Sequence, residues 1–297
     1  MAVIETSRLT KRYGEQRGIE DVTLSVESGE VFGFLGPNGA GKTTTVRTLL
    51  DLLHPTAGTA HIFGLDSRRD SVEIRARLGN LPGEFSFEPR LTGREVIALF
   101  AGLRGTSGFG RGEVLAERLR ADLDRPIGHL SRGNRQKIGL IQALFHAPDL
   151  LLFDEPTTGL DPLMQEEFMA IVAEERAQGR TVFLSSHDLD EVERVCDRVG
   201  IIREGRLVAV EAVADLTEKA FRHVSLELAE PPTPEEFASL PGVMDVAVDG
   251  RRISFKATGA VDPIIKAAAR HEVLDIELAH PSLEEIFLTY YTDGPAA

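Results

Sequence analysis

The chain has 297 residues, of which 42% are hydrophobic and 27% charged, so it can bury a large core in one extended domain or in two ordinary ones. Its 33 Lys and Arg residues against 47 Asp and Glu leave a formal net charge of −14, which disfavours a protein that coats nucleic acid. The single cysteine, Cys196, excludes an internal disulfide and fits a reducing compartment, so we expect a cytoplasmic location.

The sequence contains no membrane-spanning pattern. No stretch approaches the ~18 consecutive apolar residues that such a helix needs, and the first residues, "MAVIETSRLTKRYG", lack the apolar core of a secretion signal. We therefore expect that the chain itself neither crosses a membrane nor leaves the cell by that route.

The early residues predict strands, a glycine-rich turn and a helix. Val22, Leu24 and Val26 alternate with polar residues, as in a half-buried strand, and "GEVFGFLG" (29–36) indicates a buried one. A helix is expected from Gly41 through "KTTTVRTLLDLL".

Between about 70 and 147 the pattern is largely helical, with "TGREVIALFAGL" and "GEVLAERLRADL" separated by the loop "RGTSGFGRG" (104–112). We expect a helical insertion here, with its subdomain at about 90–147.

Strands and helices alternate again after about 150. Apolar runs predict further strands: "DLLLFD", "TVFLSS", "VGIIRE" and "RLVAV". Met164, Phe168, Ile171 and Val172 recur at helical spacing. Parallel strands joined by crossover helices are the simplest arrangement.

The composition changes after about 220. A Pro-rich segment, "EPPTPEEF", comes near the start, and three short strands, "HVSLELA", "MDVAVDG" and "RRISFKA", precede the helix "DPIIKAAARHEV". We expect a first domain at 1–220 and a small α+β domain at 221–297.

Gly36 to Thr43 matches G-x-x-x-x-G-K-[ST], the phosphate-binding (Walker A) loop, between a predicted strand and a predicted helix. In this motif backbone N–H groups surround the phosphates, Lys42 reaches the terminal phosphates, and the Thr43 hydroxyl binds Mg²⁺.

Two carboxylates follow the apolar strand in "LLLFDEP" (150–156). At the end of a parallel strand, Asp154 can hold Mg²⁺ through water and Glu155 can act as the general base on the attacking water. The alternative is an acid that caps a helix.

His187 follows another apolar strand in "LSSHDLDEV". Beside Asp154 in the predicted sheet, its imidazole can bond the γ-phosphate and position the water. An ordinary polar histidine is the alternative.

A second anion site is indicated by "LSRGNRQKIGL" (130–140), where Ser131 and Gly133 stand at a predicted helix start. Free backbone N–H groups, a hydroxyl and the positive end of the helix dipole meet there. A capped helix start without a ligand is the alternative.

"GPNGAGKTT", "LSRGN", "LLLFDEPTTGLD" and "SSH", in this order, resemble the nucleotide-binding subunit of ATP-binding cassette (ABC) transporters over about 3–220. The resemblance implies a P-loop NTPase fold: an α/β RecA-like core, an N-terminal antiparallel β subdomain and a helical insertion, followed here by the small α+β domain. The closing "HPSLEEIFLTYY" (280–291) is similar to subunits of the daunorubicin-resistance branch of drug exporters.

The resemblance also implies ligands and roles. ATP and Mg²⁺ are the expected ligands, with Lys42, Glu155 and His187 in catalysis and Thr43 and Asp154 on the metal. The nucleotide-binding residues implied are Tyr13 against adenine, Gly36, Pro37, Asn38, Gly39, Ala40, Gly41, Lys42, Thr43 and Thr44, and, across a dimer, Ser131, Gly133, Asn134 and Asp161.

Two positions depart from the family pattern. Arg132 and Asn134 replace a glycine and a glutamine of the signature, but backbone donors survive both changes. Gly83 replaces the glutamine of the loop that touches Mg²⁺ and faces the membrane subunit, so Glu84 or a water must substitute, or hydrolysis tolerates the loss.

These features predict an ATP-hydrolysing subunit of an exporter of drugs or other hydrophobic compounds. The resemblance implies that two copies pair head to tail around ATP, so that the signature of one covers the nucleotide on the other. We expect the movement to pass to a separate permease through the 80–90 loop and the helical insertion, and the chain to lie on the inner face of the cell membrane. Leu99 and Phe100 can contact the permease there, but simple core burial is the favoured alternative for both.

Two other functions are weighed. A soluble ABC protein acting on ribosomes or nucleic acid generally carries two cassettes or a long insertion, which this chain lacks, and we expect no nucleic-acid partner. A regulatory GTPase lacks support because no N-K-x-D tetrapeptide is present. The role of the C-terminal domain is left between dimer contacts, adjustment of the permease interaction and a purely structural appendage.

Overall fold

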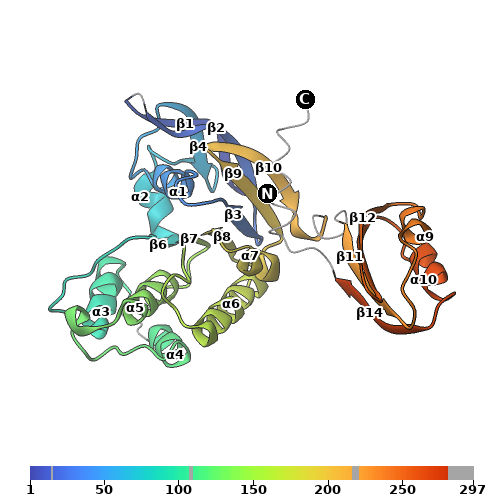
Figure 1. The fold of residues 1–297 in the computed structure, drawn as a ribbon. Coiled ribbons are helices and arrows are strands. Elements are labelled where there is room, and N and C mark those ends of the chain that lie inside the picture. Colours follow the sequence, from blue (N-terminus) through green and yellow to red (C-terminus); the bar gives the residue numbers. More distant parts are fainter. Residues whose placement is uncertain (15, 107–109, 216–220, 280–297) are drawn as a thin grey trace. The chain divides into compact units, whose positions relative to one another are not determined.

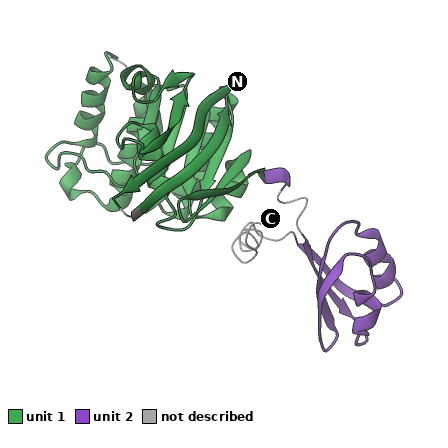
Figure 2. Cartoon of the chain, turned by 90° about the horizontal axis from the view of Figure 1, so that it is seen from above, with its two compact units in different colours: residues 1–212 green, residues 213–297 purple. Residues whose placement is uncertain are grey.

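The structure is a computed structural model that describes residues 1–14, 16–106, 110–215 and 221–279. The chain divides into two compact units, 1–212 and 213–297, coloured separately in Figure 2. This division falls slightly before the boundary at about 220 that the composition suggested. The motif at 280–291 and part of the loop at 104–112 lie outside the described residues. In the described part of the chain no helix is long and apolar enough to span a bilayer.

The first unit is built on a six-stranded sheet of order β10-β9-β3-β8-β7-β6 (Figure 1). Its strands are β3 (Val31–Leu35), β6 (Leu78–Leu81), β7 (Leu150–Asp154), β8 (Thr181–Ser186), β9 (Arg198–Arg203) and β10 (Arg206–Ala212). The five strands from β9 to β6 in this order are parallel, as predicted. "RLVAV", in β10, is instead antiparallel to β9, because only two residues join the strands and no crossover fits.

Helices cover both faces of this sheet: α1 (Lys42–Leu49), α6 (Pro162–Ala177) and α7 (Leu189–Val195). On one face, Phe32 and Phe34 of β3 share a core cluster with Val46 of α1. On the other face, Gly33 backs onto α7 so closely that an added Cβ would lie 2.9 Å from Val192. Because both faces are covered, all five residues of β3 are buried.

A second sheet of the first unit is antiparallel, of order β2-β1-β4-β5. Its strands are β1 (Ala2–Tyr13), β2 (Gln16–Glu27), β4 (Ala57–Ile62) and β5 (Leu65–Asp66). The alternating Val22, Leu24 and Val26 of β2 point inward and join the core cluster that contains Phe32. The expected N-terminal antiparallel subdomain is confirmed.

The region expected to be largely helical contains α2 (Ser71–Ala76), α3 (Gly93–Leu103), α4 (Gly110–Arg118), the 3₁₀ turn η1 (Ile127–His129) and α5 (Arg132–Leu144). Thr92 and Glu95 form a capping box that starts α3. The prediction was wrong at 78–81, which is strand β6 of the main sheet. Four residues are too few for a helical or strand period to show.

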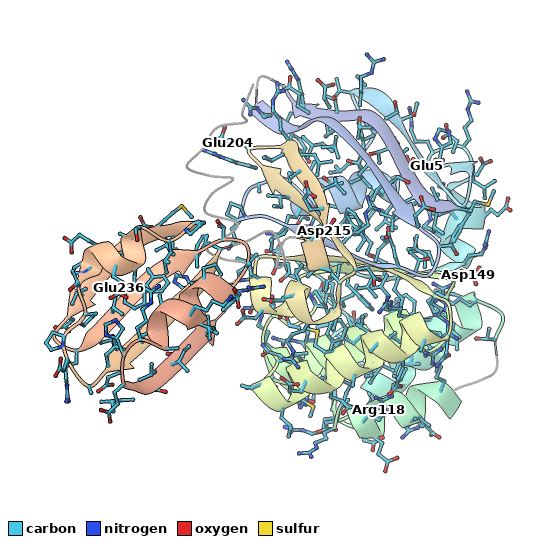
Figure 3. All side chains as sticks on the ribbon, turned by 90° about the vertical axis from the view of Figure 1, so that its right-hand side faces the viewer. Glu5, Arg118, Asp149, Glu204, Asp215 and Glu236 are labelled. Carbon is cyan, nitrogen blue, oxygen red and sulfur yellow. The ribbon has the colours of Figure 1, made fainter. Side chains whose placement is uncertain are left out.

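Ion pairs join α4 to α6 within the first unit. Arg118 donates to Glu174 and to Glu167, both at 2.6 Å, and Figure 3 labels Arg118 on its helix. Arg111 of α4 and Arg180 bind Glu175, which is only 2% exposed. Charge, as well as apolar packing, therefore connects the helical part with the core.

The second unit has the order β11-α9-β12-β13-α10-β14 along the chain, with its sheet arranged β12-β13-β11-β14. The elements are β11 (Arg222–Leu228), α9 (Pro234–Ala238), β12 (Val243–Asp249), β13 (Arg252–Ala257), α10 (Asp262–Ala268) and β14 (Val273–Ala279). This is the ferredoxin-like split βαβ arrangement. Its core includes Val224, Leu226, Phe237 and Ile253.

The α+β character of this unit is confirmed, but the sequence missed two of its elements. The single-turn α9 lies in the Pro-rich segment, where Pro234 takes the first helical turn that its missing N–H permits. The edge strand β14 was also missed, although apolar and acidic residues alternate over 274–278 as they do in a strand.

Candidate active site

The carboxyl ends of β3, β7 and β8 meet at one edge of the main sheet. Leu35 of β3 pairs with Ser186 of β8, and Asp154 of β7 pairs with Ser185 of the same strand. The loops that follow these strands therefore start side by side, although the strands end at Leu35, Asp154 and Ser186 in the sequence.

The glycine-rich turn after β3 leads into α1, whose first residue is Lys42. The N-cap, Gly41, has φ 111°, which a residue with a Cβ rarely adopts, and no side chain caps the first N–H groups of the helix. These donors and the positive end of the helix dipole are thus available to an anion.

Lys42 is almost completely buried, with 5% of its side chain exposed. Its Nζ donates to the carbonyl oxygen of Gly36 at 2.5 Å and lies 3.0 Å from Glu155 Oε1. A buried ammonium group costs free energy unless it is paired, so the turn is organised around this charge.

Glu155 joins Lys42 to His187. Its Oε2 lies 2.5 Å from His187 Nδ1, while its Oε1 contacts Lys42. The neighbouring Asp154 is 1% exposed and accepts a hydrogen bond from Ser185 Oγ at 2.5 Å. The Glu155 carboxylate therefore links Lys42, which begins α1, to His187, which follows β8.

A hollow of about 240 Å³ lies over the glycine-rich turn. Its lining comprises Tyr13, Arg17, Gly18, Pro37, Asn38, Gly39, Gly41, Lys42, Thr43, Thr44 and Glu155. Tyr13, 45% exposed, has Lys11 Nζ 5.5 Å from its ring centroid. Most of the residues predicted to hold the base and the phosphates of ATP thus share one hollow, whereas Gly36 and Ala40 are buried and do not line it.

The residues present fit a magnesium ion that arrives with a nucleotide. Asp154 Oδ2 and the Thr43 hydroxyl are hard oxygen ligands, which Mg²⁺ prefers. Among the residues described, no group of three or more His, Cys, Asp or Glu side chains could hold a metal alone. This combination suits an ion that takes its remaining ligands from phosphates and water.

Ser131 and Asp161 both cap helices away from this hollow. Ser131 Oγ accepts from Asn134 N at 3.2 Å at the start of α5, and Asp161 accepts from Met164 N at 3.0 Å at the start of α6. Ser131, Gly133, Asn134 and Asp161 do not line the hollow in one copy of the chain. Their expected role across a dimer remains a prediction.

Gly83 contacts the carboxylate that is expected to bind the metal. A Cβ on Gly83 would lie 3.0 Å from Asp154 Oδ2, so any larger residue here would meet this group directly. Glu84 is exposed. Gly83, which stands where the family has glutamine, is therefore close to the Asp154 carboxylate.

Sequence reasoning missed two buried residues that hold the loops of the site. Gln136 of α5, 6% exposed, donates to the carbonyl oxygen of Pro156 at 2.7 Å. Glu191 of α7 accepts from Ser186 Oγ at 2.8 Å, and burial raises the pKa of this carboxyl. Glu191 lies in the first turn of α7, five residues after the serine that ends β8.

The fold and the site together define a P-loop NTPase: a parallel sheet with a glycine-rich turn before a helix, a buried lysine and two adjacent carboxylates.

Comparison with known proteins narrows this class. The ABC transporter family model matches residues 19–158. The bacitracin transport ATP-binding protein of Bacillus licheniformis is 37% identical over 233 residues, covering 77% of this chain and 76% of that protein. The Nod factor export ATP-binding protein I of Burkholderia orbicola is 37% identical over 227 residues and 73% of each chain.

A solved structure described as the ATP-binding subunit of an ABC transporter has a TM-score of 0.68 and 32% identity, covering 72% of this chain and 91% of that one. The chain belongs to the ABC transporter family and is an ATP-binding subunit, an ATPase coupled to transport.

Proposed function

We propose that two copies of this chain enclose ATP and Mg²⁺ between them and use hydrolysis to drive a separate membrane permease that exports a drug or another hydrophobic compound. The observation that carries this proposal is the pairing of Lys42 and His187 with Glu155 at the phosphate-binding turn.

The bound γ-phosphate competes with Glu155 for its two partners. Lys42 lies 3.0 Å from one carboxylate oxygen of Glu155, and His187 Nδ1 lies 2.5 Å from the other. An incoming phosphate offers both groups a stronger anionic partner. Glu155 is then free to accept a proton from the attacking water, while Lys42 and His187 stabilise the charge that develops on the phosphate.

Mg²⁺, held by Thr43 and Asp154, would neutralise charge on the phosphate oxygens when bound. Asp154 is prepared for this role because Ser185 holds one carboxylate oxygen and thereby orients the other. Gly83 has no side chain to bind a metal, and a Cβ there would lie 3.0 Å from Asp154 Oδ2, so water would supply a ligand that this position lacks.

The second half of the site comes from the other copy. Ser131 is exposed, and so is Asp161, although the side chains of both are already ordered by helix capping. The start of α5 presents its N–H groups, with Gly133 and Asn134, to the γ-phosphate on the other copy. ADP lacks that phosphate, so hydrolysis releases the pair.

The permease surface lies near the 80–90 loop. A cavity of about 340 Å³ there is lined by Phe85, Phe87 and Phe100, with Arg75 and Arg104 beside them. Figure 1 shows α3 beside α5 in this part of the unit. A permease helix with apolar side chains and an acidic group suits such a lining, and its engagement places the chain on the inner face of the membrane.

The test measures the ATPase rate per chain across a dilution series. We expect the rate to fall as dimers dissociate, and Ser131→Ala to lower kcat by about tenfold because one donor to the phosphate is lost. Ser28→Ala, at an exposed serine, serves as the matched control. Full activity of a solitary chain, unaffected by dilution or by loss of the Ser131 hydroxyl, would overturn the proposal.

A second measurement addresses the partner. The chain should sediment with membranes only when a permease is co-expressed, and Phe87→Ser should weaken this association without changing the ATPase rate of the chain alone. Sedimentation with ribosomes instead would assign the protein to the other class of ABC protein.

A further inference from the structure

Gln136 connects the signature helix to the main chain beside Glu155. Its side chain is 6% exposed, and its Nε2 donates to Pro156 O at 2.7 Å, with Glu155 O at 3.5 Å. Both acceptors belong to the turn that follows β7. A buried amide that donates to two successive carbonyl oxygens is well placed to set the conformation of that turn.

The main chain at Glu155 is strained. Its φ is +53°, in the left-handed region that side chains with a Cβ rarely adopt, and the following residue is Pro156, which restricts it further. Such a conformation is unfavourable and persists only where neighbouring groups impose it. It also turns the Glu155 carboxylate toward Lys42 and His187.

The strained residue is held from both sides. On the sheet side, Glu155 N donates to Ser185 O at 3.1 Å. On the other side, Gln136 binds the carbonyl oxygens of Glu155 and Pro156. Glu155 O also accepts from Thr158 N at 3.3 Å. Of these restraints on the main chain, the bonds from Gln136 come from a side chain, so they can be removed by substitution while the main-chain bonds remain.

A second contact ties the same helix to the same loop. A Cβ added to Gly133 would lie 2.6 Å from Gly159 O, so the first turn of α5 rests directly on the backbone of the loop that runs from Glu155 to Asp161. Displacement of the start of α5 must therefore move this loop as well.

We propose that Gln136 is a positioning residue for Glu155 and that it transmits the state of one nucleotide site to the other. This inference rests on the proposed function. In the head-to-tail dimer Ser131 contacts the nucleotide of the other copy, whereas Glu155 serves the chain's own nucleotide. Gln136 lies on the helix that Ser131 begins, so closure on one nucleotide orients the base at the other.

The test compares Gln136→Met with Gln178→Met. Methionine keeps the length of glutamine and removes the donor, and Gln178 is an exposed glutamine at the end of α6 whose Oε1 accepts from Arg180. We expect Gln136→Met to lower kcat about tenfold to a hundredfold with KM for ATP changed less than about twofold. The control should match the parent, and the Hill coefficient for ATP should fall toward one in Gln136→Met alone.

A double substitution separates positioning from a general structural effect. If Gln136 acts through Glu155, adding Gln136→Met to Glu155→Gln should not reduce the residual rate further. An equal loss in both backgrounds, or a normal kcat in Gln136→Met, would overturn the inference. Should Gln136→Met fail to fold, Gln136→Glu is an isosteric replacement that also lacks the donor, and the same outcomes apply to it.

These results also distinguish the inference from the proposed function. Normal hydrolysis by Glu155→Gln would contradict the proposed base and the positioning role together. An inactive Glu155→Gln beside a fully active Gln136→Met would contradict only the positioning role.

Discussion

The carboxyl edge of the main sheet and the second unit differ in whether they bury charged side chains. In the first unit Lys42 and Asp154 are 5% and 1% exposed. Among the described residues of the second unit no charged side chain is buried to this degree. Its ion pairs, such as Lys256 with Asp245, lie on the surface.

This difference indicates where function lies. Burying charge costs free energy, and a chain that needed only stability would avoid it. The second unit does so: Phe237 and Phe255 pack in an apolar core, with ring centroids 5.7 Å apart and ring planes tilted by 32°. The first unit buries the charged side chains of Lys42 and Asp154 and holds Glu155 in a strained backbone conformation. Such features cluster at functional sites. The comparison predicts that substitutions at the sheet edge change the rate of catalysis, whereas those in the second unit change stability.

The largest expected effect is on catalysis. Glu155→Gln should lower kcat for ATP hydrolysis by about a thousandfold or more, because the amide cannot accept the proton of the attacking water. ATP binding should persist, and ATP-dependent dimers should accumulate. Glu166→Gln, at an exposed glutamate paired with Arg194, is the matched control and should change kcat less than about twofold. Equal rates in the two variants would remove the role assigned to Glu155.

A large effect on stability is expected from the core of the second unit. Phe237→Ala should lower the free energy of unfolding of that unit by about 3–5 kcal/mol, since the ring is completely buried. Calorimetry on the full chain measures it. Ile265→Ala, at a residue 44% exposed, should cost far less. Similar losses in both variants would show that the second unit is not held together by this apolar core.

An intermediate effect depends on pH. Burial lowers the pKa of His146 to about 4, whereas the unfolded chain protonates this group near pH 6.5. The folded form binds the proton less well, so stability is lost as pH falls from about 6.5 toward 4.

His146→Phe removes the titrating group, while Leu78 O keeps the hydrogen bond that it accepts from Arg104. The parent should lose about 1–2 kcal/mol more than this variant between pH 6.5 and pH 5, measured by denaturant unfolding. His129→Phe, at an exposed histidine, should keep the parent's pH dependence. A slope unchanged by His146→Phe would mean that the folded protein protonates His146 normally.

The smallest effect is expected on the surface of the second unit. Lys266 and Asp262 form an ion pair at 2.8 Å on α10, four residues apart, with both side chains largely exposed. Lys266→Ala should lower stability by about 0.5 kcal/mol or less, and 1 M salt should abolish the difference. A loss of stability in Lys266→Ala that persists in 1 M salt would show that this surface ion pair stabilises the second unit more than an exposed pair should.

Much of the site could be predicted because its motifs are local. The glycine spacing before Lys42 and the acidic pair after an apolar strand are legible in a few consecutive residues. Gln136 gave no such signal, since its partner lies 20 positions away and is a main-chain carbonyl. Strand β6 was missed for a related reason: four residues next to a helix carry no period, and only pairing with β7 makes them a strand.

The sequence by itself determined which residues are candidates to bind phosphate and metal, because that chemistry belongs to residue types at short, fixed spacings. Tertiary structure decided how they are held. The Glu155 carboxylate lies between Lys42 and His187. Gln136 donates to the carbonyl oxygen of Pro156, the next residue, and Gly83 lies beside the Asp154 carboxylate. These arrangements depend on strands that become neighbours only when the sheet forms, since pairing distant segments is the one thing that a local pattern does not encode.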